Sequence, residues 1–446
     1  MAGAAIGWAV SLASVLAAGV EWPQFRGPNG DGHAAAVNLP SEWSEQQNLV
    51  WKTAIPGRGW SSPVIGGGLI WVTTAVEHQA TPAELQAQKS RLSGNPMASQ
   101  MTLVGSITLR AVAVDAQTGK LVRDIRLFDV KDPQPVHSLN SYASPSPVLA
   151  DDRLVCHFGA YGTACVNVAD GEILWKADLP NDHSVGPGSS PIVFEDLVII
   201  PCDGADTQYV AALDLLTGKP GWKTPRPPMT GDKGDLHKAF STPYVAEING
   251  QPQAIIVGAQ WVVAYEPRTG KEIWRLNHGA GFSNVPRPVV GNGCIYICTG
   301  FMRPELVAIR ETARGEIGES DVLFRVKRQM PAQPSPVLVG KEIYVVSDQG
   351  IATCLDALTG EQLWQERVEG NYSGSPLAAD GKLYFSNREG QTSVIKPGRR
   401  FELLAVNQLD GQLMASPAAI DGALILRSEL HLYRLGQNAG SGADRN

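Results

Sequence analysis

The stretch SPVLVGKEIYVVSDQGIATCLDALTGEQLW, residues 335–364, predicts four short antiparallel strands joined by tight turns. Apolar residues dominate or alternate over 335–339, 342–346 and 351–356, and a fourth strand begins at Gln362. Glycines stand between these runs, where tight turns need backbone conformations that other residues adopt only at a cost. We therefore expect this unit to fold as one small antiparallel sheet.

The beginning of this unit, a residue that is usually small followed by Pro and an apolar run, recurs eight times along the chain. The eight prolines are Pro63, Pro147, Pro191, Pro243, Pro288, Pro336, Pro376 and Pro417. Repeats of about 40 to 50 residues built from short strands are typical of propellers. The sequence thus predicts an all-β protein, an eight-bladed β-propeller of four-stranded antiparallel blades.

The last repeat, residues 416–435, has room for only three strands. The missing strand lies near the other end of the chain, where residues 48–52 (NLVWK) stand alone as an apolar strand. Pairing the two ends would remove two exposed sheet edges, which otherwise invite association with other chains. We therefore expect an N-terminal strand to close the ring.

A turn glycine followed four residues later by Trp recurs in several repeats. The pairs are Gly171 and Trp175, Gly218 and Trp222, Gly270 and Trp274, and Gly360 and Trp364. Regular spacing of large aromatic residues indicates rings packed between neighbouring blades, because each ring buries a large apolar area there. We interpret these Trp residues as structural.

The chain outside the repeats divides into a start, an insertion and an end. Residues 1–20 have an apolar core followed by small residues, which predicts a signal peptide and an exported, periplasmic or cell-envelope protein. The propeller is expected over 21–435 and a disordered tail over 436–446. Residues 77–106 interrupt the first repeat with a helical segment that begins at Pro82, and they are a candidate lid.

Composition narrows the partners and the compartment. A net charge of -7 without a Lys/Arg cluster argues against nucleic acid, and beyond the start no segment is long and apolar enough to span a membrane. We expect a monomer. None of the six cysteines has zinc-ligand spacing. Cys156 and Cys165 would lie opposite each other around a turn at 159–162, which allows a disulfide, while two buried free thiols are the favoured alternative.

One face of the predicted ring is expected to carry the function. If the strands of a blade are named a to d from the axis outward, the irregular d–a connections and the b–c turns share a face, and polar and aromatic residues converge on a channel mouth there. The candidate residues at this channel mouth are Arg58, Trp60, Asn140, Tyr142, His183, Phe282, Asn284, Arg287 and Tyr372. In the b–c turn CDGADTQ, Asp203 and Asp206 are candidate calcium ligands, with turn capping as the alternative.

The stretch ALDLLTG (212–218) with Trp222 resembles the pyrroloquinoline-quinone-like (PQQ-like) β-propeller repeat. The strings WPQFRGPNGDG (22–32), WKTAIPGRGWSSP (51–63) and CDGADTQYVAALD (202–214) look like a group of exported bacterial propellers of this kind. The resemblance extends over about residues 22–435. It implies an eight-bladed ring held together by docked Trp residues.

Two better-understood groups within this resemblance imply different functions. Quinoprotein alcohol dehydrogenases hold PQQ and calcium in the channel mouth, but the chain has no adjacent cysteines and no recognisable calcium-ligand motif. The outer-membrane assembly propeller lipoprotein binds its partner through loops, although the lipid-bearing Cys of such a protein is missing here.

We therefore favour an exported, non-catalytic binding or scaffold protein that recognises an envelope protein or polymer through the face of the d–a and b–c loops. The alternative is a PQQ-dependent dehydrogenase with a diverged site and calcium as a second cofactor. A hydrolase with two facing carboxylates ranks last, because no spacing supports a pair among its candidates. Those candidates are Asp182, Asp203, Glu305 and Asp348.

Overall fold

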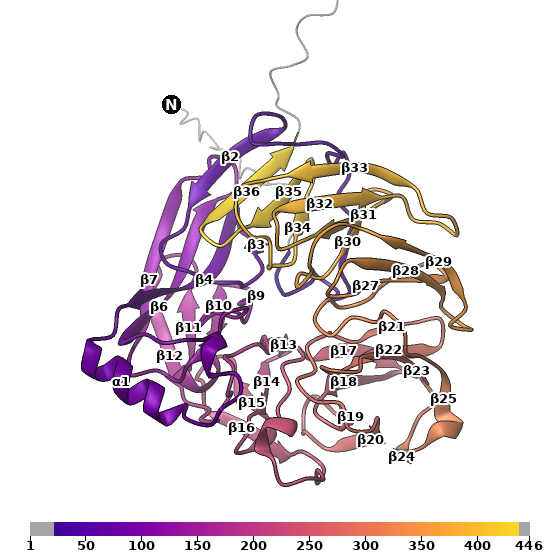
Figure 1. Ribbon diagram of the computed structural model, residues 1–446, viewed down its shortest axis with the longest axis horizontal. Coiled ribbons are helices and arrows are strands. Elements are labelled where there is room, and N and C mark those ends of the chain that lie inside the picture. The colour runs from indigo at the N-terminus through magenta and orange to yellow at the C-terminus, as the bar shows by residue number, and fades with distance from the viewer. Residues whose placement is uncertain (1–21, 437–446) are drawn as a thin grey trace, which may run out of the picture.

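The computed structural model describes residues 22–436, which form eight small sheets arranged around a central axis (Figure 1). The prediction of an all-β, eight-bladed propeller with four-stranded antiparallel blades is confirmed, with two blades carrying a fifth strand. The predicted signal peptide at 1–20 and the predicted tail, apart from its first residue, lie outside the described residues.

The blades follow one another in sequence, and each runs from an inner strand a to an outer strand d. Blades one to four are β3 (Val64–Gly66), β4 (Leu69–His78), β6 (Ser106–Asp115) and β7 (Leu121–Lys131); β9 (Val148–Ala150), β10 (Arg153–His157), β11 (Thr163–Asn167) and β12 (Ile173–Ala177); β13 (Ile192–Phe194), β14 (Leu197–Asp203), β15 (Gln208–Asp214) and β16 (Pro220–Pro225); and β17 (Tyr244–Ile248), β18 (Gln251–Val257), β19 (Trp261–Tyr265) and β20 (Glu272–Asn277). Blades five to eight are β21 (Val289–Gly291), β22 (Cys294–Thr299), β23 (Glu305–Arg310) and β25 (Val322–Val326); β26 (Val337–Val339), β27 (Glu342–Val346), β28 (Ile351–Asp356) and β29 (Gln362–Arg367); β30 (Leu377–Ala379), β31 (Lys382–Ser386), β32 (Gln391–Ile395) and β33 (Leu403–Gln408); and β34 (Ala418–Ile420), β35 (Ala423–Arg427), β36 (His431–Gly436) and β2 (Leu49–Ala54). The fifth strands are β1 (His33–Ala34), parallel to β30, and β24 (Gly315–Ile317), parallel to β20.

The ring closes as the sequence predicts. The N-terminal strand β2 is antiparallel to the C-terminal strand β36, with Lys52 opposite Tyr433 and Thr53 opposite Leu432. Figure 1 shows this junction, where indigo β2 lies beside yellow β36. Blade eight takes three strands from the C-terminal part of the chain and one from the N-terminal part. It therefore has four strands like the other blades, and the outer edge of β36 is paired.

The residue before each repeated proline links neighbouring blades. Its hydroxyl accepts the backbone N–H of the equivalent residue in the preceding blade, at 2.8–3.0 Å, in seven of the eight positions. These seven hydroxyl residues, which we call the hydroxyl ring, are Ser62, Ser146, Ser190, Thr242, Ser335, Ser375 and Ser416. Arg287 stands at the eighth position. The recurrent Ser-Pro pair therefore ties the inner strands together, because each buried N–H finds an acceptor across the blade boundary.

The aromatic residue of strand d docks on the next blade. Trp175 donates its Nε1–H to the carbonyl of Leu215 at 2.9 Å, and its ring lies against Gly218. A Cβ at Gly218 would come within 2.6 Å of that ring, and the φ of +69° also favours glycine there. Trp51 and Trp222 dock on the following blades in the same way. The sequence-based interpretation of the Trp spacing is confirmed at these blade boundaries.

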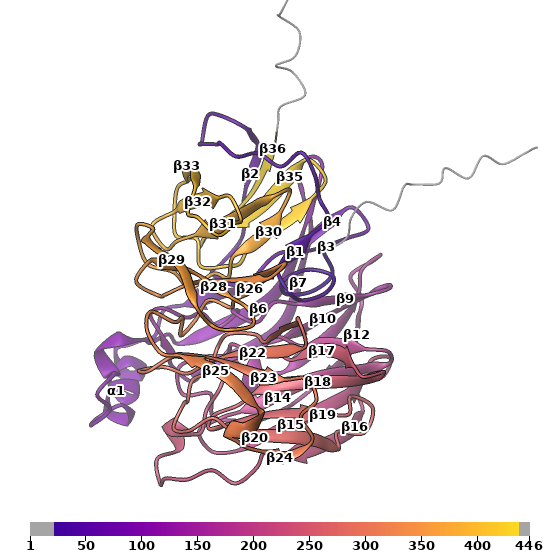
Figure 2. The ribbon, with the colours of Figure 1, turned by 90° about the vertical axis from the view of Figure 1, so that its right-hand side faces the viewer.

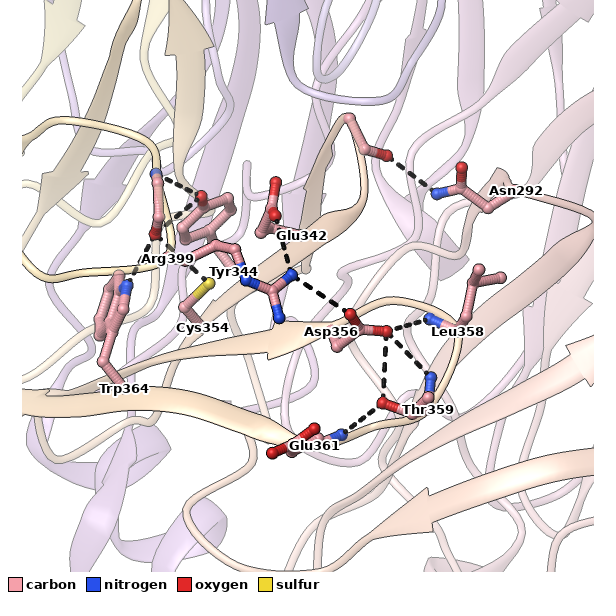
Figure 3. A network of polar contacts seen from close by, with 12 residues as sticks. Asn292, Glu342, Tyr344, Cys354, Asp356, Leu358, Thr359, Glu361, Trp364 and Arg399 are labelled. Atoms are coloured by element: carbon pink, nitrogen blue, oxygen red, sulfur yellow. Dashed lines mark hydrogen bonds and ion pairs between the residues drawn. The ribbon is translucent and has the colours of Figure 1, made fainter.

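Two positions differ from this pattern. Trp274 is fully buried under β24 and donates to Gln253 within its own blade, so it does not dock on a turn of blade five. Trp364 donates to the carbonyl of Gly398, in a loop of blade seven (Figure 3). Arg399 beside it reaches Glu342 and Asp356 of blade six at 3.4 and 3.3 Å. Contacts from loops thus replace the regular turn at these boundaries.

The register of blade two separates two cysteines that the sequence analysis placed opposite each other. Cys156 lies opposite Ala164, and Cys165 lies opposite Val155. The connection between β10 and β11 spans residues 158–162, one residue longer than the assumed turn, and a shift of one residue turns a side chain to the other face of the sheet. The predicted opposition is wrong, and all six cysteines are buried and free.

Residues 22–34, which we call the N-terminal plug, cross the channel. Trp22 pairs with Ile65 of β3, the carbonyl of Pro23 accepts from Leu149 of β9, and that of Gly32 accepts from Ala378 of β30. These partners follow the repeated prolines along the inner strands. The N-terminal plug therefore lies deeper in the channel than the hydroxyl ring and connects distant blades across the axis.

The insertion in blade one forms helix α1 (Pro82–Arg91), which starts with a capping box between Thr81 and Glu84. Figure 2 shows α1 protruding from one side of the disc. Arg91 and Gln88 both bond Asp132. The short strands β5 (Met101–Thr102) and β8 (Val136–His137) then pair, and 3-10 turns occur at Ala98–Gln100, Gly159–Tyr161, Gly234–Leu236 and Glu319–Asp321. Among residues 22–436 no helix has the length and apolar character needed to cross a membrane.

Candidate functional site

A cavity of about 530 Å³ opens at the centre of the face that carries the d–a connections. All eight d–a connections contribute to its wall, Phe301 joins from a b–c turn, and Met97 and Gln100 come from the insertion. Phe25 of the N-terminal plug also lines it, and because the N-terminal plug lies deeper than the hydroxyl ring, Phe25 forms the floor. The cavity is therefore a closed-bottomed cup.

A simple sequence rule describes most of the wall. The seven residues of the hydroxyl ring line the cavity, and so do all eight residues that stand two positions before the ring positions. Those eight residues are Trp60, Ser144, Gly188, Phe240, Val285, Gln333, Ser373 and Met414. The residue before a proline is held extended, so side chains two positions apart point the same way. Phe240 and Met414 were not among the predicted site residues, and this spacing was the signal that would have found them.

The wall is mostly apolar and nearly free of charge. Lys238 is the one Lys, Arg, Asp or Glu residue among the lining residues described. Its Nζ is 2.6 Å from Asp235 and 3.2 Å from the hydroxyl of Ser184. Lys238 is only 5% exposed, and neither partner of its ammonium group is among the lining residues described.

Three of the predicted channel-mouth residues line the cavity. Trp60 is 6% exposed, and its buried Nε1 has no hydrogen-bond partner among residues 22–436. Phe282 packs edge-on against Phe301, with ring centroids 6.2 Å apart. Asn140 is held in place by the carbonyls of Val185 and Pro187. These residues form the wall, and the Asn140 amide is already used to shape it.

Arg58 lies behind this wall. Its guanidinium is 5.6 Å from the Trp60 ring, and its Nε is 3.1 Å from Glu429. Arg58 therefore braces Trp60 from outside the cavity.

Other predicted residues are packed inside the ring. Tyr142 and Tyr372 are fully buried, and the hydroxyl of Tyr372 donates to the carbonyl of Glu369. Asn284 is also fully buried and bonds Gly258 and Gly300. His183 packs edge-on against Tyr161, at 5.2 Å between ring centroids, and burial lowers the pKa of His183 to about 3. None of these four predicted residues lines the cavity.

Arg287 anchors the N-terminal plug. Its Nε donates to the carbonyl of Pro243 at 2.9 Å, Nη1 to the carbonyl of Phe25 at 2.6 Å and Nη2 to the side chain of Gln24 at 3.2 Å. Gly30 lies so close to the guanidinium that a Cβ would overlap it, and its φ is +71°. The guanidinium is thus committed below the cavity floor.

The two candidate calcium ligands have other partners. Asp203 receives two hydrogen bonds from Arg226, at 2.9 and 2.7 Å, and both side chains are 1% exposed. Asp206 accepts the backbone N–H groups of Asp182 and Thr207, at 2.6 and 2.9 Å. Each carboxylate satisfies a structural donor, which is the turn-capping alternative in the case of Asp206.

The residues present do not fit PQQ with calcium. An anionic quinone needs cations beside it, and calcium needs several oxygen ligands, whereas Arg58, Arg287 and Asp203 are paired with protein groups outside the cavity. Over the described part of the chain, no three His, Cys, Asp or Glu side chains come together as a metal-binding group would require.

A second hollow of about 720 Å³ continues outward from the cavity over blades five to seven. The two share four lining residues, which are Leu139, Phe301, Ala332 and Gln333. Leu139, Phe301 and Met302 are 43%, 51% and 74% exposed, which is unusual for large apolar side chains gathered at one place. We call these three residues the apolar rim.

A channel floored by an N-terminal segment and blades joined by docked Trp residues define an eight-bladed β-propeller of the PQQ-like type. The chain belongs to the family described as outer membrane protein assembly factor BamB, which matches residues 66–260 and 258–414. The resemblance seen in the sequence is thereby confirmed.

Individual relatives are distant. The outer membrane protein assembly factor BamB of Burkholderia pseudomallei is 28% identical over 229 residues, which cover 50% of this chain and 55% of the relative. Across the curated relatives matched, the shared stretch spans 32–55% of the relative's length.

Two solved structures share the fold, one of a BamB protein and one of a dehydrogenase. BamB from Moraxella catarrhalis has a TM-score of 0.53 at 15% identity, covering 75% of this chain and 99% of that one. A europium-containing methanol dehydrogenase has a TM-score of 0.60 at 10% identity, covering 93% of this chain and 90% of that one. At these identities the likeness concerns the fold alone.

Proposed function

We propose that this protein is an exported, non-catalytic scaffold that binds a partner protein through the face of the d–a and b–c loops. The observation that carries the proposal is the apolar rim beside the cavity, because exposed clusters of large apolar side chains mark interaction sites. Membership of a family named for outer membrane protein assembly supports a partner in that process and a location in the cell envelope. We expect the protein to act as a monomer that contributes one face.

The quinoprotein alternative is less well supported, because its candidate charged residues already have partners within the protein. The predicted cations and carboxylates are consumed by protein contacts, and Lys238 is the one charged residue in the cavity wall described. The hydrolase alternative is equally weak, because Glu305 faces Arg325 at 3.4 Å and Lys327 at 3.5 Å. A binding role requires only the surface that is present.

The experiment is site-specific photo-crosslinking in intact cells. A photo-reactive residue replaces Met302 in the apolar rim or, as a matched control, Leu216, which is 60% exposed on a c–d turn of the opposite face. We expect position 302 to crosslink a component of the outer-membrane assembly machinery and position 216 to give no such product.

Two variants extend the test. Leu139→Ser and Phe301→Ser, each combined with the photo-reactive residue at position 302, should lower recovery of that product at least about tenfold, if they are central contacts worth about 1.4 kcal/mol or more. Equal crosslinking from both faces, or crosslinking from position 216 alone, would overturn the proposal.

A further inference from the structure

The hydroxyl ring has a chemical property beyond its structural role. Each hydroxyl accepts one backbone N–H, and a hydroxyl also carries one proton to donate. Over residues 22–436, none of the seven ring hydroxyls donates to a protein acceptor, and all seven are at most 6% exposed. Because all seven line the cavity, their protons form a band of donors around its lower wall.

The remainder of the cavity is suited to an apolar body. Trp60, Phe240, Phe282 and Met414 rise above or beside this band, and Phe25 closes the floor. Lys238 is the one charged residue of the same wall, and its ammonium group is already paired with Asp235. A volume of about 530 Å³ lies within the range of about 300–1,000 Å³ that is usual for small-molecule sites.

We propose that the cavity binds an amphiphile with one carboxylate. Its apolar body would lie against the aromatic and Met side chains, and its two carboxylate oxygens would accept hydrogen bonds from adjacent hydroxyls of the ring. A carboxylate only accepts hydrogen bonds, so it matches a band of donors. No Asp or Glu residue is among the lining residues described, so no carboxylate of the wall repels the head group. The carboxylate has two sources, a free fatty acid or the C-terminal residue of a peptide.

The first experiment measures binding of dodecanoate and its methyl ester to the purified protein by calorimetry. The ester has the same chain but lacks the charge, so it isolates the contribution of the head group. We expect saturable binding of one dodecanoate, at least about tenfold tighter than the ester, since hydrogen bonds to a charged group are stronger than those to a neutral one. Absence of dodecanoate binding, or equal affinity for the ester, would overturn the proposal.

Variants locate the ligand. Ser375→Thr keeps the hydroxyl, and Thr242 shows that the ring accommodates a Thr. Ser375→Val introduces a side chain of the same shape as Thr but without the hydroxyl. A purely structural role of Ser375 would weaken binding of both ligands equally. We expect the ratio of dodecanoate to ester affinity to fall in the Val variant and to persist in the Thr variant. An unchanged ratio in the Val variant would contradict recognition by the ring.

Val285→Trp fills the cavity from its wall and should abolish binding while the circular dichroism spectrum is retained. Binding that survives this change lies elsewhere and overturns the assignment. The source of the carboxylate is tested with a short peptide ending in Leu as free acid or amide. Preference for the acid over both the amide and dodecanoate identifies a chain terminus, and preference for dodecanoate identifies a fatty acid. The calorimetry needs no partner protein, so its failure is distinct from failure of the crosslinking.

Discussion

Replacing Asp203 by Asn tests whether that carboxylate serves Arg226 or an ion. The two side chains are 1% exposed and joined by hydrogen bonds of 2.9 and 2.7 Å. Burial lowers the pKa of Arg226, but the neighbouring Asp203 outweighs burial and raises it overall, so the guanidinium stays charged. Asn leaves this buried charge without its counter-charge.

Breaking a buried pair by removing one partner costs about 3–5 kcal/mol. Asn keeps one acceptor oxygen for Arg226, so we expect Asp203→Asn to lower the free energy of unfolding by about 3 kcal/mol, the lower end of that range. The measurement is equilibrium unfolding in urea at neutral pH, in buffer with calcium and in buffer with EDTA. The loss should be the same in both buffers.

The matched control is Asp206→Asn, three residues further along the same turn. Asp206 only accepts backbone N–H groups, which an amide oxygen also does, so its free energy of unfolding should change by less than about 1 kcal/mol. The reasoning is refuted if Asp203→Asn is as mild as the control. It is also refuted if EDTA destabilises the wild-type protein as much as the substitution does, since the carboxylate would then serve an ion.

Two further predictions concern pH and packing. Burial lowers the pKa of His157 to about 4 and that of His183 to about 3, so the unfolded chain, with an ordinary value of 6.5, binds more protons. The free energy of unfolding is therefore highest above pH 6.5 and decreases as the pH falls, by about 2 kcal/mol per histidine at pH 5. Urea unfolding at pH 7 and at pH 5 measures this loss. Equal free energies of unfolding at the two pH values would contradict the prediction. Gly218→Ala places a methyl group 2.6 Å from the Trp175 ring at a φ of +69°, which should destabilise the protein by about 1–3 kcal/mol; a melting temperature equal to that of the wild type would show that the blade boundary yields.

The blades were readable from the sequence because their signals are local. Alternating apolar residues and turn glycines act over a few residues, and the lone strand at 48–52 fitted the one blade that lacked its fourth strand. Where a distant segment intervened, the local signal failed. Trp274 has the spacing of a docking Trp, but β24, brought from residues 315–317, covers it.

The site was only partly readable. Trp60, Asn140 and Phe282 line the cavity, whereas Tyr142 and Tyr372 are packed in the interior. The irregular connections carry no period over most of their length, so the direction of each side chain depends on what packs against the loop. The exception is the extended residue pair before each proline, where alternation fixes the direction.

The sequence by itself determined the number of blades, the closure of the ring and the face on which the irregular loops gather, because each follows from short-range periodicity and from counting repeats. The tertiary structure decided what each loop residue does. Arg287 occupies the same repeat position as Ser335, yet its guanidinium turns below the floor to the carbonyl of Phe25, 262 residues away in sequence. A buried guanidinium goes where acceptors are found, and only the folded ring brings the N-terminal plug beneath it.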